Sequence, residues 1–318
     1  MTPRRLRAAL YQAGLAAAVA LVAWYVVSNT AANLESRRIA SGFGFLAREA
    51  GFEIGETTFI AYSAADSYLR ALAVGVFNTF RVAGIGVVAA TLAGSLLGLA
   101  RLSPNWLLGK LAAGYVEVIR NVPLLVQLFF WYAVIAENLP GPGEALQPLP
   151  GVFLSNRGIV FPTPWSTPVL SGFNFTGGVT LTPEFATLLT GLITYTAAFI
   201  GEIVRAGVLS VGRGQLDAAY SIGLARRGAL RYVVLPQALR LIVPPLTSQY
   251  LNLAKNSSLA VAIGYPDLVS IANTTMNQTG QAIEGIAIIM AVYLTLSLSI
   301  SAFMNWYNRR VALKGTRP

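Results

Sequence analysis

Residues 214–240, GQLDAAYSIGLARRGALRYVVLPQALR, join two long apolar segments and decide how the whole chain is interpreted. Asp217 is expected in the first turn of a short helix, where the helix dipole stabilises a carboxylate. Ala218 and Ala219 follow, and their methyl side chains let another surface approach the backbone closely. Gly223 supplies the left-handed residue that ends such a helix. The stretch therefore predicts a compact helical knob.

A second short helical stretch, residues 225–234, is expected to lead from this knob to Leu235 and Pro236. A proline disfavours helical geometry in the residue before it, so the helix should not continue through Leu235. We expect this break to fix the angle between the knob and the next apolar segment.

Composition identifies an integral membrane protein. Of 318 residues, 55% are hydrophobic and 11% are charged, with a mean hydropathy of +0.60, whereas soluble domains carry about 25% charged residues. The chain has no cysteine and no histidine, which excludes disulfide frameworks, thiol nucleophiles and the commonest metal ligand and general base. We expect no catalytic residues, no metal site and no cofactor on this chain.

A helix needs about 20 apolar residues to cross a bilayer. Six segments of the sequence meet this requirement and are the predicted spans: Ala9–Asn29, Tyr68–Ala100, Ala113–Ala136, Leu181–Ala206, Leu241–Ile263 and Gln281–Tyr307.

The distribution of basic residues predicts the orientation. With the N-terminus in the cytoplasm, fifteen of the 23 Lys and Arg residues fall on the cytoplasmic side and five on the outside. Basic residues concentrate in cytoplasmic loops, so both termini should be cytoplasmic. The net charge of +10 thus reflects topology in a lipid bilayer, and no nucleic-acid partner is expected.

Two regions lie outside the predicted core at 68–310. Residues 1–67 resemble a signal peptide at their start, but the apolar run continues past the usual length, and we expect an uncleaved extra span followed by an external segment. Residues 137–183 alternate prolines, glycines and aromatics, which forbids a continuous helix. They form either an external loop whose aromatics lie on the membrane or a partner, or a tethered surface flap. Residues 311–318 are expected to be a cytoplasmic tail.

The spacing of Asp217-Ala218-Ala219, Gly223 and Val233-Val234-Leu235-Pro236 resembles the EAA loop of ATP-binding-cassette (ABC) importer permeases, with Asp where the family usually has Glu and Val233 where Ile is common. Flanking stretches are similar to the polar and general L-amino-acid branch, and the resemblance covers residues from about 75 to 310. Those stretches are Arg120-Asn121-Val122-Pro123-Leu124-Leu125-Val126-Gln127, Glu202-Ile203-Val204-Arg205-Ala206-Gly207, Gly214-Gln215, Pro236-Gln237-Ala238, Pro244-Pro245-Leu246 and Lys255-Asn256-Ser257-Ser258-Leu259.

This resemblance implies an all-α integral membrane fold of about six transmembrane helices, with a type I ABC importer-like permease core and a cytoplasmic coupling helix in the loop at 207–240. It implies that the chain works in the bacterial inner membrane with a second permease, identical or homologous, two ATPase subunits and a periplasmic amino-acid-binding protein. ATP and magnesium would be bound by the ATPases, and this sequence indeed has no GxxxxGK[ST] phosphate loop. The residues implied to couple to the ATPase are Gln215, Asp217, Ala218, Ala219, Gly223, Leu235 and Pro236.

Polar residues within predicted spans are candidates for substrate binding, because a charge in the membrane is costly unless it is paired or hydrated. Lys255 lies beside Asn252, Asn256 and Ser257, and this polar run is suited to the zwitterionic backbone of an amino acid. The alternative is that Lys255 pairs with a carboxylate of a neighbouring span or subunit.

Two further candidates lie on other spans. Arg81 on the second span could bind a substrate carboxylate or extend toward the outer headgroups. Tyr195 on the fourth span could contact substrate or only hydrogen-bond between helices.

Two rival functions remain. An ion-coupled secondary transporter would need no knob and should carry an acid in the middle of a span, and none is predicted here. A non-translocating accessory subunit stays open, because a homologous partner could hold the only complete substrate site.

Overall fold

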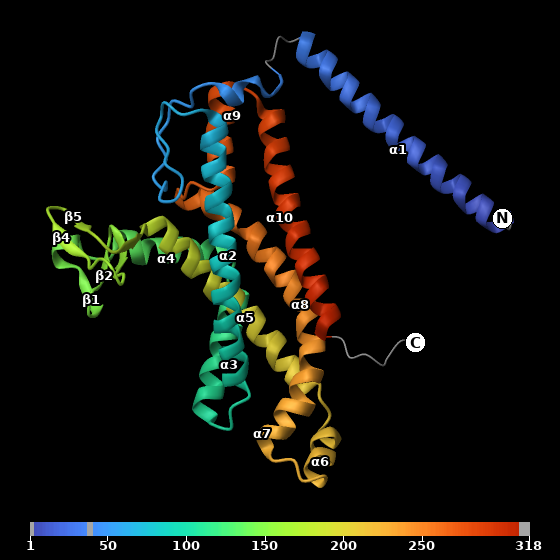
Figure 1. The fold of residues 1–318 in the computed structure, drawn as a ribbon, viewed down its shortest axis with the longest axis vertical. Helices are drawn as coiled ribbons and strands as arrows, with labels where there is room; N and C mark the ends of the chain where they lie inside the picture. Colours follow the sequence, from blue (N-terminus) through green and yellow to red (C-terminus); the bar gives the residue numbers. More distant parts are fainter. Residues whose placement is uncertain (1–2, 37–40, 312–318) are drawn as a thin grey trace.

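The computed structural model describes residues 3–36 and 41–311, so the predicted tail lies outside the described residues from 312 on. The chain is mostly helical (Figure 1). Its α-helices are α1 (Pro3–Ser36), α2 (Tyr68–Arg101), α3 (Trp106–Asn121), α4 (Leu124–Tyr132), α5 (Pro183–Leu209), α6 (Arg213–Ser221), α7 (Arg226–Ala229), α8 (Leu235–Asn256), α9 (Leu268–Thr279) and α10 (Ala282–Val311).

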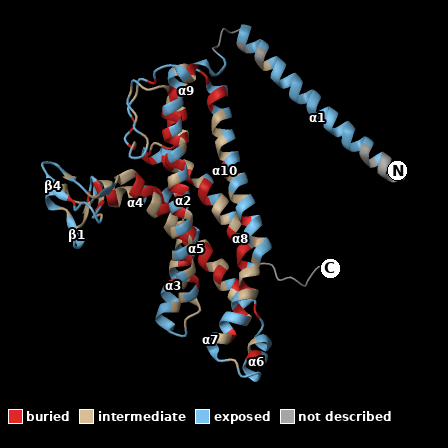
Figure 2. Ribbon diagram, viewed as in Figure 1, coloured by how far each residue is buried: buried red, intermediate tan, exposed pale blue. Residues whose placement is uncertain are grey.

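The bundle of α2, α5, α8 and α10 has two recognisable ends (Figure 1). We call the end that bears α6 and α7 the lower end, and the end that bears α9 and residues 41–67 the upper end. Burial is concentrated in α2, α5, α8 and α9, while α10 is largely exposed (Figure 2). The apolar part of α1 stands apart from the bundle with none of its length buried.

Fewer helices than expected meet the criterion for crossing a membrane. In the described part of the chain, α1, α2, α5 and α10 are long and apolar enough, and a bent pair made by α3 and α4 can count as a fifth. The predicted fifth span corresponds to α8 and a following 3-10 helix, η5 (Ser257–Ile263). Its polar residues lower its hydropathy below that of a typical span, although it is central to the bundle.

The predicted third span is bent by 105° between α3 and α4 rather than being one straight helix. Pro123 forces Val122 into extended geometry, with φ −100° and ψ 128°. The amide of Gln127 donates hydrogen bonds to the carbonyl oxygens of Ile119 at 2.9 Å and Val122 at 3.0 Å. This buried side chain therefore satisfies carbonyls that the bend leaves without helical partners.

Close backbone contact joins α2 to α5. A Cβ atom added to Gly94 would lie 2.6 Å from the Cβ of Ile200, and one added to Gly98 would lie 2.7 Å from the Cβ of Val204. Small residues four apart allow two membrane helices to approach this closely. The two helices therefore pack as one unit.

Residues 137–183 contain ordered strands, which the sequence did not predict. Strands β1 (Leu146–Leu149), β2 (Val152–Ser155), β3 (Gly158–Phe161) and β6 (Val179–Leu181) form an antiparallel sheet in that order, and β4 (Val169–Ser171) pairs with β5 (Asn174–Thr176). The rings of Phe153 and Phe175 stack at 4.6 Å between the two sheets. Prolines and glycines exclude helix here but permit short strands joined by turns. Trp165 and Phe173 remain 91% and 93% exposed.

Candidate functional site

The lower loop, residues 207–240, carries a short helix with two different faces. On α6, Ala219 is buried and Leu216 packs against the apolar cluster at the lower end of the bundle. Asp217, Ala218 and Ser221 are exposed on the other side. The helical repeat separates these two sets, so one face anchors α6 and the other is presented outward.

Two details of this helix differ from the sequence-based expectation. The helix begins at Arg213, directly after Gly212, so Asp217 is its fifth residue and lies in the second turn. Its first turn contains no acidic residue. Of the two alanines only Ala218 is exposed, because the helical rotation turns Ala219 inward.

The turn after α6 has the predicted left-handed geometry. Gly223 has φ +84°, and its N–H donates to the carbonyl of Tyr220 at 2.9 Å, while the N–H of Leu224 donates to that of Ala219 at 3.1 Å. Ile222 directly precedes this glycine and is 79% exposed. Sequence reasoning missed Ile222, although an isoleucine next to a turn glycine in a polar loop is the feature that would have identified it.

The predicted break before Pro236 is wrong. α7, a π-helical turn at Leu230–Val234 and α8 form one continuous helical path. The N–H of Leu235 donates to the carbonyl of Leu230, a five-residue step that widens the helix just before the proline. The wider turn makes room for the ring of Pro236, which has no N–H to donate, at the second residue of α8. Leu235 is exposed there, as is Gln215 on α6.

The lower loop is joined firmly to the bundle. Val211 and Val234, at its two ends, belong to one buried apolar cluster with Val204 of α5 and Ile242 of α8. At Gly207 an added Cβ would lie 2.3 Å from a side-chain carbon of Ile242. A displacement of α6 would therefore be transmitted directly to α5 and α8.

Ion pairs reinforce the lower end just above this loop. The carboxylate of Glu202 on α5 pairs with Arg205 one turn later, with Nε to Oε1 at 3.2 Å, and also with Arg101 at the end of α2. The two guanidinium groups share one acid, which ties the lower ends of α2 and α5 together.

The polar run at the end of α8 is exposed on one side only. Ser248, Asn252 and Lys255 lie on one side of the helix and are exposed in the single chain. Asn256 is half-buried, and Ser257 is buried with its hydroxyl donating to the carbonyl of Ala254 at 2.8 Å. Lys255 and Asn252 therefore point outward together, while Ser257 serves the backbone.

The other two substrate candidates lie apart from each other. Tyr195 packs on Phe199, with ring centroids 4.9 Å apart, and belongs with Leu259 of η5 to one apolar cluster. It therefore lies across from the helix that directly follows the polar run. Arg81 lies toward the upper end and pairs with Glu56 at 3.0 Å.

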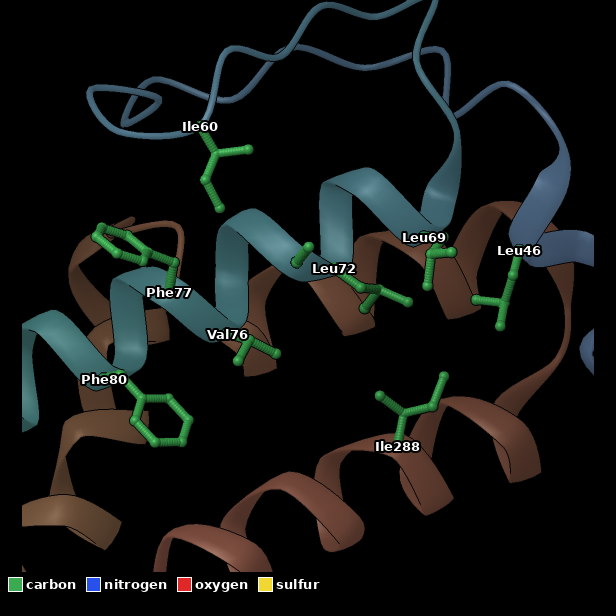
Figure 3. Close-up of a pocket in the computed structure, with 9 residues that line it drawn as sticks. Leu46, Ile60, Leu69, Leu72, Val76, Phe77, Phe80 and Ile288 are labelled. Carbon is green, nitrogen blue, oxygen red and sulfur yellow. The ribbon is translucent and has the colours of Figure 1, made fainter.

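A larger pocket lies away from these candidates, and no polar side chain of the described residues lines it. It occupies about 750 Å³ between the upper half of α2, residues 46 and 60, and Ile288 of α10. Figure 3 shows only aliphatic and phenyl side chains directed into it, including Val76, Phe77 and Phe80. Its lining is suited to apolar chains and not to a zwitterion.

The chain matches a known family of transport proteins. The family described as binding-protein-dependent transport system inner membrane component matches residues 86–313. The chain is 43% identical to the general L-amino acid transport system permease protein AapQ of Rhizobium johnstonii, covering 91% of this chain and 88% of that protein. It is 34% identical to the glutamate/glutamine/aspartate/asparagine transport system permease protein BztB of Rhodobacter capsulatus, covering 91% and 90%.

Solved structures of ABC transporters share the fold of this chain. A crystal structure of an amino acid ABC transporter with histidines matches with a TM-score of 0.58 and 27% identity, over 76% of this chain and 95% of that one. The methionine ABC transporter MetNI, at 16% identity and a TM-score of 0.55, shares the fold. The chain therefore belongs to the binding-protein-dependent transport system inner membrane components, which are multi-pass permease subunits of ABC transporters and not enzymes.

Proposed function

We propose that this chain is the membrane-spanning subunit of an ATP-driven importer that moves L-amino acids across the bacterial inner membrane. The lower end faces the cytoplasm together with both termini. Two ATPase subunits bind ATP and magnesium, a periplasmic amino-acid-binding protein delivers the substrate, and a second permease, identical or homologous, completes the path. No cofactor is held by this chain.

The outward face of α6 carries this proposal. Asp217, Ala218, Ser221 and Ile222 present a small, partly apolar surface at the tip of the bundle. The opposite face is anchored in a cluster shared with α5 and α8. A surface of this kind fits a groove on a separate subunit, and closure of two ATPases would move both helices.

The substrate path is proposed along α8. Asn252 and Lys255 are exposed polar groups on a central helix, and Asn256, Ser257 and Tyr195 lie at or across from its end. The ammonium of Lys255 would meet the substrate carboxylate. Arg81 can take that role only in a state where its ion pair with Glu56 is open.

Purification from native membranes tests the function. We expect two ATPase chains and a second permease to be recovered with this chain, and uptake by the reconstituted complex to require ATP and the binding protein. Recovery of this chain with a separate, complete pair of permeases would instead make it an accessory subunit. Family membership argues against the ion-coupled alternative, which would transport without any ATPase.

Replacement of Ile222 by Asp sharpens the test. A charge on the docking face should release the ATPases while the permeases stay assembled, since central apolar contacts carry most interface energy. Leu149→Asp, at an exposed apolar position on β1, is the matched control and should keep the ATPases bound. Retention of the ATPases by Ile222→Asp would remove α6 as the docking site.

A further inference from the structure

A buried ion pair holds the upper end of the molecule together. The Glu56 carboxylate and the Arg81 guanidinium lie 3.0 Å apart, with their side chains only 4% and 10% exposed. Glu56 belongs to residues 43–67, which we call the upper strap, and Arg81 belongs to α2. Burying two charges is costly unless they are closely paired and further hydrogen-bonded.

Further hydrogen bonds from other elements meet that requirement. The second carboxylate oxygen of Glu56 accepts a hydrogen bond from the hydroxyl of Thr182. Thr182 is also the N-cap of α5, where it accepts from the N–H of Phe185. One carboxylate therefore connects the upper strap to the upper half of α2 and to the start of α5.

Asn78 of α2 connects a fourth element, the turn before α9, to this network. Its amide nitrogen donates to the carbonyl of Glu56 at 3.1 Å and to that of Pro266 at 2.9 Å. Pro266 lies in the turn between η5 and α9. The upper strap, α2, α5 and this turn thus converge on one pair of charges.

Aromatic rings cover the pair. The Arg81 guanidinium carbon lies 4.0 Å from the ring centroid of Phe185 and 5.3 Å from that of Phe59. Phe59 comes from the upper strap and Phe185 from α5, so the ion pair is covered by the same elements that it joins.

The position of this network relates it to the proposed substrate path. η5 begins directly after the polar run at 252–256 and leads to the turn that Asn78 holds. Between that turn and the upper strap lies a mainly polar hollow of about 290 Å³, with Glu53, Glu184 and Ser270 in its lining. The upper strap therefore covers the end of the molecule toward which the candidate path leads.

We propose that the upper strap is a movable cover over the outer end of the translocation path, and that Glu56 and Arg81 are the positioning residues that hold it closed. This rests on the proposed importer function. If the upper strap never moved, a buried ion pair would add little stability, because apolar side chains at the same place would hold the packed elements as well or better. A charge pair suits two states, since it is satisfied when closed and each partner is hydrated when the cover opens.

Cysteine labelling tests this motion directly, because the chain has no native cysteine. Ile54, on the upper strap, is 8% exposed and is clustered with Phe45, Leu268 and Ile271. In the full complex, Ile54→Cys should react slowly with a membrane-impermeant maleimide at rest. It should react about tenfold faster when nucleotide, vanadate and the binding protein hold the complex outward-open.

Gly55→Cys is the matched control. Gly55 is the next residue, is exposed, and has open space where a side chain would lie, so its labelling should be fast in both states. Equal labelling of Ile54→Cys in the two states, with uptake intact, would show a static clasp and overturn the proposal. Absence of ATP-dependent uptake by the native complex would instead overturn the importer function.

The ion pair itself is tested in the same complex. Glu56→Gln should raise resting labelling at Ile54→Cys and raise ATP hydrolysed per substrate moved, whereas Glu56→Asp, which keeps the carboxylate, should change both less. A purely structural role would lower the amount of assembled complex but leave ATP hydrolysed per substrate unchanged, which would overturn the proposal. If Glu56→Gln fails to assemble, labelling of Ile54→Cys in the otherwise native complex still decides.

Discussion

The lower loop and the upper strap both connect apolar helices, but different forces hold them. The lower loop is built from neighbours in sequence: α6, the left-handed Gly223 and the π-helical turn lie within 22 residues and hydrogen-bond mostly among themselves. The upper strap has little regular structure; beside a few local backbone hydrogen bonds, it is fastened to the bundle by polar partners 22 to 126 residues away and by apolar packing on α9. A locally folded element transmits motion as a unit, whereas a strap fastened mainly by contacts with other elements can separate from them when those contacts open together.

We expect the largest effect on transport from Gly223→Val in the lower loop. A β-branched residue is strained at φ +84°, so the turn after α6 would be misshapen and uptake should fall by more than about tenfold, as for loss of an interface anchor. Gly214→Ala, at an exposed position of α6 with open space around it, should transport normally. Normal uptake by Gly223→Val, measured in vesicles with equal amounts of inserted protein, would contradict the role of the turn.

Gly98→Val tests how closely α2 and α5 pack between the two regions. The added side chain would overlap Val204, and overpacking of this kind typically costs about 1–3 kcal/mol. The thermal midpoint of the purified protein should fall. Gly84→Val, on an exposed side of α2 with nothing within 4 Å, should leave it unchanged, and an equal midpoint for both variants would show that the crossing is not tight.

Lys255→Met tests the substrate path between the two regions. Removal of the ammonium should raise the substrate concentration needed for half-maximal uptake by about tenfold, the usual value of one charge-assisted hydrogen bond. ATP hydrolysis by the assembled complex should change less. Unchanged substrate affinity would favour the alternative in which Lys255 pairs with a neighbouring subunit.

The smallest effect is expected at the bend between α3 and α4. Gln127→Leu removes the two hydrogen bonds to Ile119 and Val122, each worth about 0.5–1.5 kcal/mol. Stability in detergent should fall modestly while uptake persists. Gln249→Leu, a half-buried glutamine on α8, is the comparison for stability alone, and unchanged stability of Gln127→Leu would show that its two hydrogen bonds do not support the bend.

The contrast between the two regions also explains what the sequence could predict. Gly223 and the alternation of faces on α6 follow from local rules of helix geometry, and the family resemblance rested on the same residues. The break at Pro236 was predicted wrongly, because the rule that a proline ends a helix ignores the π-helical turn that accommodates it. The short strands at 146–181 were missed because prolines and glycines mark turns without indicating what pairs between them.

The upper end could not be predicted from sequence for a more general reason. Nothing in the sequence around Glu56 distinguishes it from the other acidic residues of its segment. Only the fold brings it to Arg81, Thr182 and Asn78. Arg81 was therefore considered a substrate or headgroup contact, because its partner 25 residues earlier was not recognisable. The bend in the third span was likewise missed, although Pro123 was visible in the sequence.

We propose that transport depends on a separate ATP-hydrolysing subunit that acts on the outward face of α6. Uptake of labelled amino acids into proteoliposomes tests it, comparing the purified chain alone with the complex that carries its ATPases. We expect ATP-dependent uptake by the complex and none by the chain alone. Concentrative uptake by the chain alone, without nucleotide, would contradict it.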